Sequence, residues 1–378
     1  MDNLTHTLVG LSAAKAGLER LSFGATAVCL VAANSPDSDI VAVAGGRWFY
    51  LEHHRGITHS VVGTLALALF VPLLFYACER AVARLRRRPP RARLKGLLVA
   101  SLAVSATHPL LDWTNNYGLR PWLPWSGEWY YGDLVFIVDP WLWLALGGAC
   151  FLATARTRWR VAAWCAFALA LSSAVVIALP RAGVTHAKLV AALWLAGVVA
   201  FAAARVLRPR LTGSRAAPAA ALAFVLAYWG ALAVVRSRAV IEAAETARAV
   251  AARGGESLLG VAAMPTPADP TGWLVVFETD RAHYRHELSL TDEGAARAPE
   301  RFPKLEGAEA ELVERARREH EGARVFLGFA RFPAARLTER GCAAETVLQL
   351  ADLRFTRPGA SNRRGGSFAL EIPVNSKP

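Results

Sequence analysis

Residues 61–95 read VVGTLALALFVPLLFYACERAVARLRRRPPRARLK, an apolar run followed directly by a cluster of basic residues. About 20 apolar residues in a helix cross the hydrocarbon of a bilayer, and the first part of this stretch, Val61–Ala81, is long enough to do so. Short loops rich in arginine and lysine stay on the cytoplasmic side of a membrane. The stretch therefore predicts a membrane-spanning helix and its orientation, with Arg80–Lys95 in the cytoplasm.

The same pattern recurs through the first part of the chain. The other clear spanning candidates are Gly96–Leu111, Pro140–Ala155, Val161–Leu179, Lys188–Val206 and Ala217–Val235. Two shorter segments near the start, Leu4–Leu18 and Phe23–Asn34, either span or pack as short helices inside a bundle, where protein covers them. We therefore predict a mostly α, polytopic transmembrane helical bundle of about six to eight helices over residues 1–236.

A different composition begins after Arg236, where charged residues are frequent and no apolar run is long enough to span. An amphipathic pattern predicts a helix over Ser237–Arg253. Alternation of apolar and polar residues predicts strands over Trp273–Thr279, Tyr284–Leu290, Arg324–Phe332, Val347–Phe355 and Ser367–Val374. We therefore expect residues 237–378 to form a small soluble α+β domain.

The basic charge of the chain supports a membrane topology better than nucleic-acid binding. The formal net charge is +13, and much of the excess lies in short loops between apolar runs. This distribution is typical of loops retained in the cytoplasm, so we expect no nucleic-acid partner. Alternation of the spans then places the loop before Val61, the loop Trp113–Asp139 and the C-terminal domain on the extracytoplasmic side.

Metal-type ligands are concentrated in the first 140 residues, at the ends of apolar runs. His108 and Asp112 lie four residues apart, so on a helix they share one face. Asp37 and Asp39 follow one apolar run, and histidines precede Val61. The predicted topology brings the set to one membrane face: His6, Asp37, His54, His59, His108, Asp112, Asp133 and Asp139.

Imidazole nitrogens and carboxylate oxygens are the ligands of zinc and similar divalent ions. We therefore expect a divalent metal, zinc foremost and manganese as the alternative. Such an ion activates bound water and polarises a phosphoryl oxygen, which favours hydrolysis of a membrane lipid or a lipid-linked substrate. Asp39 and Asp133 are candidates for a general base or for an acid that orients a histidine ring. Arg55 and Arg120 either contact a phosphate or are ordinary interfacial arginines.

The first half of the chain contains a set of motifs: Asp2–Thr7, Asn34–Asp39, His54–Ser60 and His108–Asp112, continued by Asn115–Arg120, Trp129–Asp133 and Ile137–Trp141. Over roughly residues 1–180 these motifs resemble one family, the YdjM-like inner-membrane proteins. The family is described as membrane-bound metal-dependent hydrolases, with a metal pattern similar to that of zinc-dependent phospholipase C, an all-helical phosphodiesterase. The resemblance implies a bacterial inner-membrane location, and it implies as metal ligands His6, Asp37, His54, His59, His108 and Asp112.

Two other functions remain open from the sequence. In the first, the chain is not an enzyme: the metal staples short helices, and the C-terminal domain binds a partner. A structural metal site is closed, whereas a catalytic site keeps an open position. In the second, the same residues transport metal ions or protons. Transporters hold their ligands near the midplane of spanning helices, and the helix-end position of these ligands argues against transport.

Overall fold

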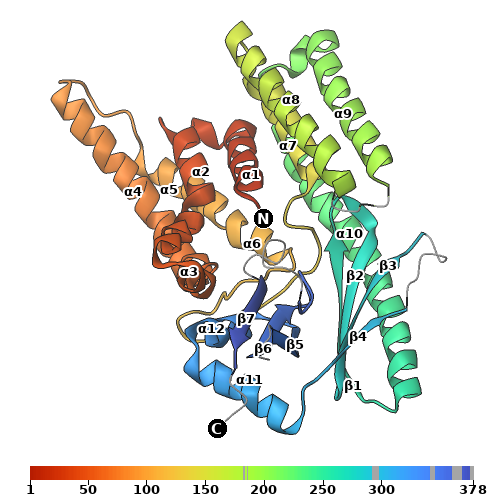
Figure 1. The fold of residues 1–378 in the computed structure, drawn as a ribbon. Coiled ribbons are helices and arrows are strands. Elements are labelled where there is room, and N and C mark those ends of the chain that lie inside the picture. Colours follow the sequence, from red (N-terminus) through yellow and green to blue (C-terminus); the bar gives the residue numbers. More distant parts are fainter. Residues whose placement is uncertain (182–183, 185, 292–297, 341–344, 360–367, 375–378) are drawn as a thin grey trace. The chain divides into compact units, whose positions relative to one another are not determined.

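The computed structural model describes residues 1–181, 184, 186–291, 298–340, 345–359 and 368–374 (Figure 1). The chain separates into two compact units. The first unit comprises Met1–Asp39, Arg55–Val234 and Pro265–Pro270, and the second comprises Ile40–His54, Val235–Met264 and Thr271–Pro378. The segment Ile40–His54 therefore folds with the second unit, although residues on either side of it belong to the first.

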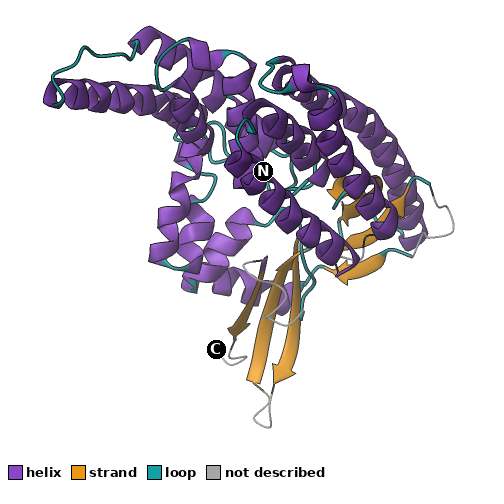
Figure 2. Cartoon of the chain, turned by 90° about the horizontal axis from the view of Figure 1, so that it is seen from above, coloured by secondary structure: helices purple, strands orange, loops and turns teal. Residues whose placement is uncertain are grey.

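Helices build the first unit (Figure 2). They are α1 (Asn3–Ala16), α2 (Ala25–Asn34), α4 (Val61–Leu85), α5 (Leu94–Ser105), α6 (Thr107–Trp113), α7 (Pro140–Thr154), α8 (Arg158–Arg181), α9 (Ala187–Leu207) and the first part of α10 (Ala216–Gly254). Short 3-10 helices join several of them: η1 (Leu18–Arg20), η2 (Ser35–Gly45), η3 (Ile57–His59) and η4 (Pro209–Leu211). The mostly α, membrane-type fold predicted from the sequence is confirmed.

Six helical stretches of the described residues are long and apolar enough to cross a membrane. They are Ala25–Gly45, Val61–Leu85, Leu94–Trp113, Arg158–Arg181, Ala187–Leu207 and Ala216–Gly254. The first differs from the sequence prediction, because η2 continues α2 beyond Asn34 and lengthens it. Pro140–Thr154, expected as a clear span, is a shorter apolar helix.

Small residues let the helices of the first unit approach closely. Helix α1 packs against α2 and α7, and α5 packs against α2 and α4. At Gly10, a Cβ atom would lie 2.8 Å from the Cβ of Ala33 and 2.9 Å from the carbonyl oxygen of Cys29. Interfaces of this kind are typical of helix packing in membranes, where close backbone approach replaces the hydrophobic driving force.

The second unit contains two small antiparallel sheets, drawn in orange in Figure 2. One has the strand order β1 (Leu258–Thr266), β2 (Asp269–Thr279), β3 (Ala282–Ser289) and β4 (Glu300–Pro303). The other has the order β5 (Pro333–Arg340), β6 (Glu345–Asp352) and β7 (Ala369–Pro373). The helices of this unit are α3 (Arg47–His53), α11 (Gly307–Glu319), α12 (Glu321–Phe329) and the last part of α10.

The last part of α10 covers the first sheet through a row of alanines. Ala239, Ala243 and Ala247 are spaced by four residues, so they share one helix face, and they form one buried cluster with Trp273 and Phe277. This face accounts for the amphipathic helix predicted over Ser237–Arg253.

One predicted strand is wrong, and three strands were not foreseen. Arg324–Phe332 was expected to be extended, but α12 spans Glu321–Phe329. Its buried residues are Ala323, Val325, Phe326 and Phe329. Their spacings of three and four residues, from Ala323 to Phe326 and from Val325 to Phe329, follow a helical and not a strand period. Strands β1, β4 and β5 lie outside every predicted strand, and Ser367 of the last predicted strand lies outside the described residues.

Candidate metal centre

Two carboxylates and two imidazoles of the first unit converge on one point. The Nε2 atom of His59 lies 3.3 Å from Oδ1 of Asp37 and 3.2 Å from Oδ2 of Asp112. The Nε2 atom of His108 lies 3.3 Å from that same Asp112 oxygen and 3.6 Å from Oδ1 of Asp37. The four donor atoms all lie within 4.8 Å of one another. The structure thus brings together four of the residues expected to bind metal.

Three chain segments deliver these side chains. Asp37 lies in η2, just after α2, and His59 lies in η3, just before α4. His108 and Asp112 lie one turn apart on α6, which starts after a break in the helix at Ala106. Pro109 is the third residue of α6, where its missing N–H removes no intrahelical hydrogen bond.

The tautomer of His108 follows from a backbone contact. Its Nδ1 atom lies 2.7 Å from the carbonyl oxygen of Ala33, in the last turn of α2. A carbonyl oxygen only accepts hydrogen bonds, so Nδ1 carries the proton and Nε2 presents its lone pair to the cluster. The α2 carboxyl end, whose last carbonyls lack partners within the helix, thereby fixes the ring of a candidate ligand.

Asp39 orients the other imidazole. Its Oδ2 atom lies 3.4 Å from Nδ1 of His59, and the hydroxyl of Thr58 lies 3.1 Å from that nitrogen. A carboxylate on the far nitrogen of a histidine is the usual support for a metal-ligating ring. Burial of His59 opposes its charged form, but hydrogen bonds to the Asp112 and Asp37 carboxylates raise the pKa of its imidazole. The two carboxylates therefore give the centre an electrostatic environment that favours a bound cation.

The geometry fits a metal ion. Four donors at about 2.0–2.2 Å from a tetrahedral zinc ion lie about 3.3–3.6 Å from one another. Four of the six separations here are 3.2–3.6 Å, and the imidazole–imidazole and carboxylate–carboxylate pairs lie within 4.8 Å. Nε2 of His108 and Oδ2 of both Asp37 and Asp112 are buried without a hydrogen-bond partner in the described part of the chain. Buried polar atoms normally have such a partner, so these atoms point to an ion.

His6 lies beside the four donors and not among them. Its ring stacks on His108, with centroids 3.8 Å apart and planes 15° from parallel. Its Nε2 atom lies 3.5 Å from Oδ1 of Asp112, the oxygen that also contacts the backbone nitrogen of Met1. His6 therefore adjoins the opposite side of the Asp112 carboxylate from His59 and His108.

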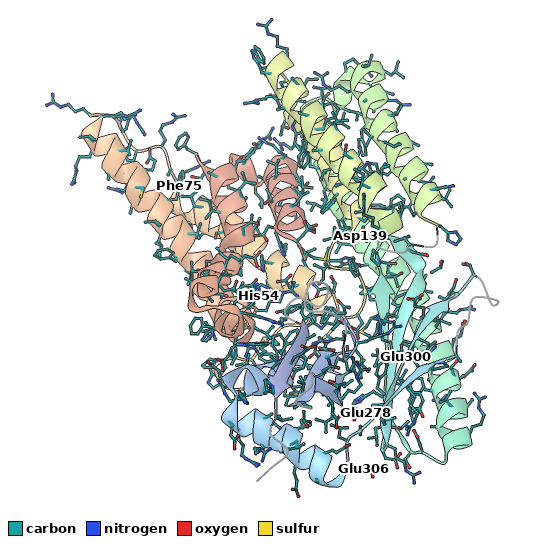
Figure 3. All side chains as sticks on the ribbon, viewed as in Figure 1. His54, Phe75, Asp139, Glu278, Glu300 and Glu306 are labelled. Atoms are coloured by element: carbon teal, nitrogen blue, oxygen red, sulfur yellow. The ribbon has the colours of Figure 1, made fainter. Side chains whose placement is uncertain are left out.

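The other predicted site residues have different surroundings. His54, labelled in Figure 3, directly follows α3, and its ring stacks on that of Tyr50 in the second unit, so it is not part of the four-donor group. Asp133 is buried, with a backbone φ of 49°. The guanidinium of Arg120 lies 4.7 Å above the ring of Trp129. Arg55 contacts Asp112 and is treated below.

Asp139 starts α7 (Figure 3). Its carboxylate accepts hydrogen bonds from the backbone N–H groups of Trp141 and Leu142 at 2.8 and 3.0 Å, and from the hydroxyl of Tyr228 at 3.0 Å. These contacts explain Asp139 as a helix cap.

Sequence reasoning assigned no role to the Ala33 carbonyl or to Asn115. The Oδ1 atom of Asn115 accepts a hydrogen bond from Arg55 at 2.9 Å and one from the backbone N–H of Tyr117 at 2.9 Å. A backbone carbonyl carries no sequence signal. The signal at Asn115 was its place in a polar turn directly after Asp112.

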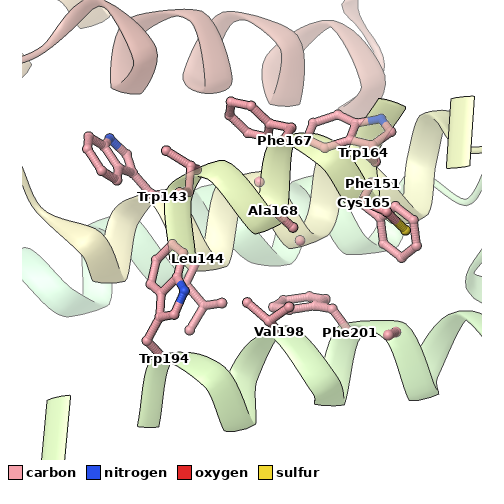
Figure 4. A pocket seen from close by; sticks show the side chains of 14 residues that line it. Trp143, Leu144, Phe151, Trp164, Cys165, Phe167, Ala168, Trp194, Val198 and Phe201 are labelled. Carbon is pink, nitrogen blue, oxygen red and sulfur yellow. The ribbon is translucent and has the colours of Figure 1, made fainter. Parts of the chain in front are cut away.

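An apolar groove with a cavity volume of about 100 Å³ lies between α7, α8 and α9 of the same unit (Figure 4). Its lining includes Trp143, Leu144, Phe167, Ala168, Trp194 and Val198. The indole N–H groups around it are satisfied elsewhere: Trp164 bonds Thr154 and Trp194 bonds Ser172. Trp143 bonds Asp2 and Thr5 at the start of α1, the helix that carries His6. The groove therefore offers a surface suited to hydrocarbon.

Comparison with known proteins gives few relatives. A curated relative is the protein named "Uncharacterized protein YfhP" of Bacillus subtilis (strain 168), which is 24% identical over 155 residues. The match covers 38% of this chain and 44% of that protein. No solved structure matches the chain.

A family model gives the broader match. The model described as "YdjM inner membrane protein" matches residues 1–182, which include all four donors of the candidate centre and the helices α1 to α8. The apolar helices and this match together show an integral membrane protein. Over residues 1–182, the chain matches the YdjM inner membrane protein family.

Proposed function

We propose that this protein is a membrane-bound, metal-dependent hydrolase that acts on a phosphoester of a lipid or a lipid-linked molecule at the extracytoplasmic membrane face. The observation that carries the proposal is the group of two imidazoles and two carboxylates, in which the donor atoms Nε2 of His108 and Oδ2 of Asp112 are buried without a hydrogen-bond partner among the described residues. Nitrogen and oxygen donors of this kind suit zinc, and manganese as the alternative.

The chain's own residues would divide the work as follows. Asp37, His59, His108 and Asp112 would hold the ion, and Asp39 would keep the His59 ring in place. A divalent ion bound there would acidify a water molecule and polarise a phosphoryl oxygen. Asp37 is the donor with the greatest exposure, 14% of its side chain against 1% or less for the other three. Substrate would therefore approach on the side of Asp37.

Two features support a lipid substrate. The groove between α7, α8 and α9 has the surface for a hydrocarbon chain, and Trp143 connects it to the start of α1, beside the centre. Trp113, Trp122 and Trp125, in the loop that follows Asp112, have 45%, 48% and 75% of their surface exposed. Tryptophan favours the headgroup level of a membrane, so this loop would lie against the lipid headgroups.

The charge pattern supports the extracytoplasmic side. Helix α4 has His59 before its first residue and basic residues after its last, and α5 and α6 run from basic residues to Asp112. Helix α7 runs from Asp139 to a basic connection, Arg156–Arg160. Each helix thus has its candidate site residue at the end opposite to its basic end. With the basic ends in the cytoplasm, the centre and the C-terminal unit would both be extracytoplasmic.

A structural metal site is the second candidate, and one observation favours it. Four protein donors fill a tetrahedral zinc ion completely, whereas a catalytic zinc keeps one position for water or substrate. A hydrolase therefore needs either an ion with five or six ligands, so that water can bind beside the four protein donors, or dissociation of Asp37 from the ion, which leaves a position for water. Cobalt(II) distinguishes these cases, because four-coordinate cobalt absorbs visible light strongly and five- or six-coordinate cobalt weakly. A strong spectrum that added phosphate leaves unchanged would support the structural site.

The direct test of the hydrolase uses the purified full chain in detergent. The wild type should contain one or more zinc or manganese ions per chain, and a folded variant with His59, His108 and Asp112 all changed to Ala should contain none. In lipid nanodiscs the metal-loaded protein should then add water across a lipid phosphoester and release an alcohol, such as a diacylglycerol, and a phosphomonoester. Metal-loaded protein that releases neither product from any phospholipid or isoprenoid phosphate offered would overturn the hydrolase.

A further inference from the structure

Arg55 has an unusual backbone conformation that its surroundings hold in place. Its φ is 52°, in the left-handed region that side chains other than glycine rarely adopt. Its backbone N–H donates to Oδ2 of Asp39 at 2.8 Å, and only 3% of the residue is exposed. A backbone conformation of this kind is strained and persists where surrounding contacts determine it.

The guanidinium of Arg55 is fixed on several sides. Nη1 donates to Oδ1 of Asn115 at 2.9 Å and to the carbonyl oxygens of Gly118 and Asp112 at 3.2 and 3.4 Å. The guanidinium carbon lies 4.8 Å above the ring of Tyr117. The turn of residues 115–118, which lies shortly after Asp112, thus surrounds the guanidinium of Arg55 with hydrogen-bond acceptors and an aromatic ring, and these groups form a socket for it.

The same guanidinium reaches the metal centre through one oxygen of Asp112. Nη2 of Arg55 lies 2.9 Å from Oδ1, whereas His59 and His108 approach Oδ2. We infer that Arg55 is a positioning residue that holds Asp112 by Oδ1, aims Oδ2 at the ion, and occupies the place of a second cation, so that the centre binds a single ion. This inference rests on the proposed metal centre.

His6 marks where a second ion would otherwise bind. Its Nε2 lies 3.5 Å from Oδ1 of Asp112, and neither ring nitrogen has a hydrogen-bond partner among the described residues. An ion beside His6 would need Oδ1 as its anionic ligand, and Arg55 and the amino group of Met1 already contact that oxygen. Two positive charges repel more strongly in a buried site of low dielectric constant than in water. Arg55 therefore excludes a second ion from this side of Asp112.

The test is a zinc titration of the metal-stripped full chain in detergent, with ions per chain counted by elemental analysis. The wild type should bind one zinc ion. Arg55→Gln should bind zinc about 10- to 100-fold more weakly, the range found when a partner of a metal ligand is removed. Arg55→Lys keeps the charge and should recover part of that loss. The matched control is Arg88→Gln, which removes an arginine that pairs with Glu79 at 2.8 Å and should leave affinity unchanged.

Asn115→Ala provides a second route if Arg55→Gln fails to fold. It removes part of the socket but leaves the cation, so it should weaken zinc binding in the same direction by a smaller factor. Cobalt(II) spectra at saturation separate positioning from folding: a misaimed Asp112 shifts the band, whereas a smaller folded fraction only lowers it.

Each contrary result identifies what has failed. Two zinc ions per wild-type chain would overturn the single-ion centre. Wild-type affinity and an unshifted cobalt band in both Arg55→Gln and Asn115→Ala would overturn positioning by Arg55. A wild type that takes up no zinc, manganese or cobalt would overturn the metal centre itself, and the proposed function with it.

Discussion

The two ring nitrogens of His108 have separate partners, and this makes its role testable. Nδ1 is bound to the carbonyl of Ala33, and Nε2 faces the two carboxylates. His108→Gln should therefore weaken metal binding more than about 100-fold, beyond the effect of losing an outer partner. His53→Gln is the control, because His53 is exposed and its Nδ1 contacts only its own helix at Phe49. Zinc titration measures both, and equal affinities would remove His108 from the centre.

At the residue scale, the sequence predicted pairs that are close in the chain better than pairs that are distant. The spacing of His108 and Asp112 determines one helix face, and the structure places their donor atoms 3.3 Å apart. Asp37 and His59 meet across an intervening segment, Ile40–His54, that folds with the second unit. No spacing rule predicts that detour. His54 is close to His59 in sequence, but it is the last residue of the segment Ile40–His54, and its ring stacks on that of Tyr50.

At the element scale, η3 depends on the absence of a side chain in α4. A Cβ atom at Gly63 would lie 1.8 Å from the carbonyl oxygen of Ile57, so Gly63→Ala must push η3 and His59 away. Overpacking of this kind costs about 1–3 kcal/mol, and zinc affinity should fall with stability. Gly230→Ala in α10 is the control, because a Cβ there has no described atom within 4 Å. It should be neutral or stabilise by about 0.5 kcal/mol. Thermal unfolding in detergent compares the two, and an unaffected Gly63→Ala would contradict the close contact.

Binding of a lipid chain in the groove can be tested with two alanines of α8, one inside the groove and one outside it. Ala168 lines the groove, whereas Ala166 on the same helix is exposed outside the lining. Ala168→Phe should fill the groove and lower crosslinking of a photoactivatable acyl lipid to the residues around it at least about threefold, since most of the volume is lost. Ala166→Phe should leave that crosslinking unchanged. Peptide mapping by mass spectrometry gives the readout, and equal labelling of both variants would mean that the lipid only coats the helices.

The sequence predicted the type of an element correctly where one hydrophobic period dominates. The prediction failed where a helical and a strand period are both present. The long apolar runs became helices, since each is long enough to span and holds few charges. In Arg324–Phe332, apolar and polar residues partly alternate, but the buried set follows the helical period. β4 has only four residues, which is too short for a sequence pattern to predict a strand, and its conformation is determined by its pairing with β3.

At the scale of the whole molecule, the second unit depends on one carboxylate that ties α10 to its first sheet. Glu256 follows the end of α10 and accepts hydrogen bonds from Thr279 at 2.6 Å, Tyr284 at 3.0 Å and Arg301 at 2.9 Å. Burial alone would raise its pKa, but these hydrogen bonds lower the pKa of Glu256 below its ordinary value. A carboxylate with a lowered pKa stabilises the fold above its unfolded pKa, and this contribution is lost as the pH falls through the folded pKa.

Glu256→Gln should therefore destabilise the second unit at pH 7, by on the order of 1 kcal/mol because Arg301 is partly exposed to solvent. The difference from the wild type should begin to shrink below about pH 4.5, where the unfolded carboxyl takes up a proton, and should disappear below the lowered pKa of the folded carboxyl. Buried His283 and His286, whose pKa values burial lowers, add an acid sensitivity that both proteins share.

Hydrogen exchange of the β2 and β3 amides, divided by the intrinsic rate at each pH, measures the difference. Glu287→Gln, on an exposed position of β3, is the control and should show little effect at any pH. A Glu256→Gln difference that stays constant from pH 7 to pH 4 would mean that the charge of Glu256 does not hold α10 to the sheet.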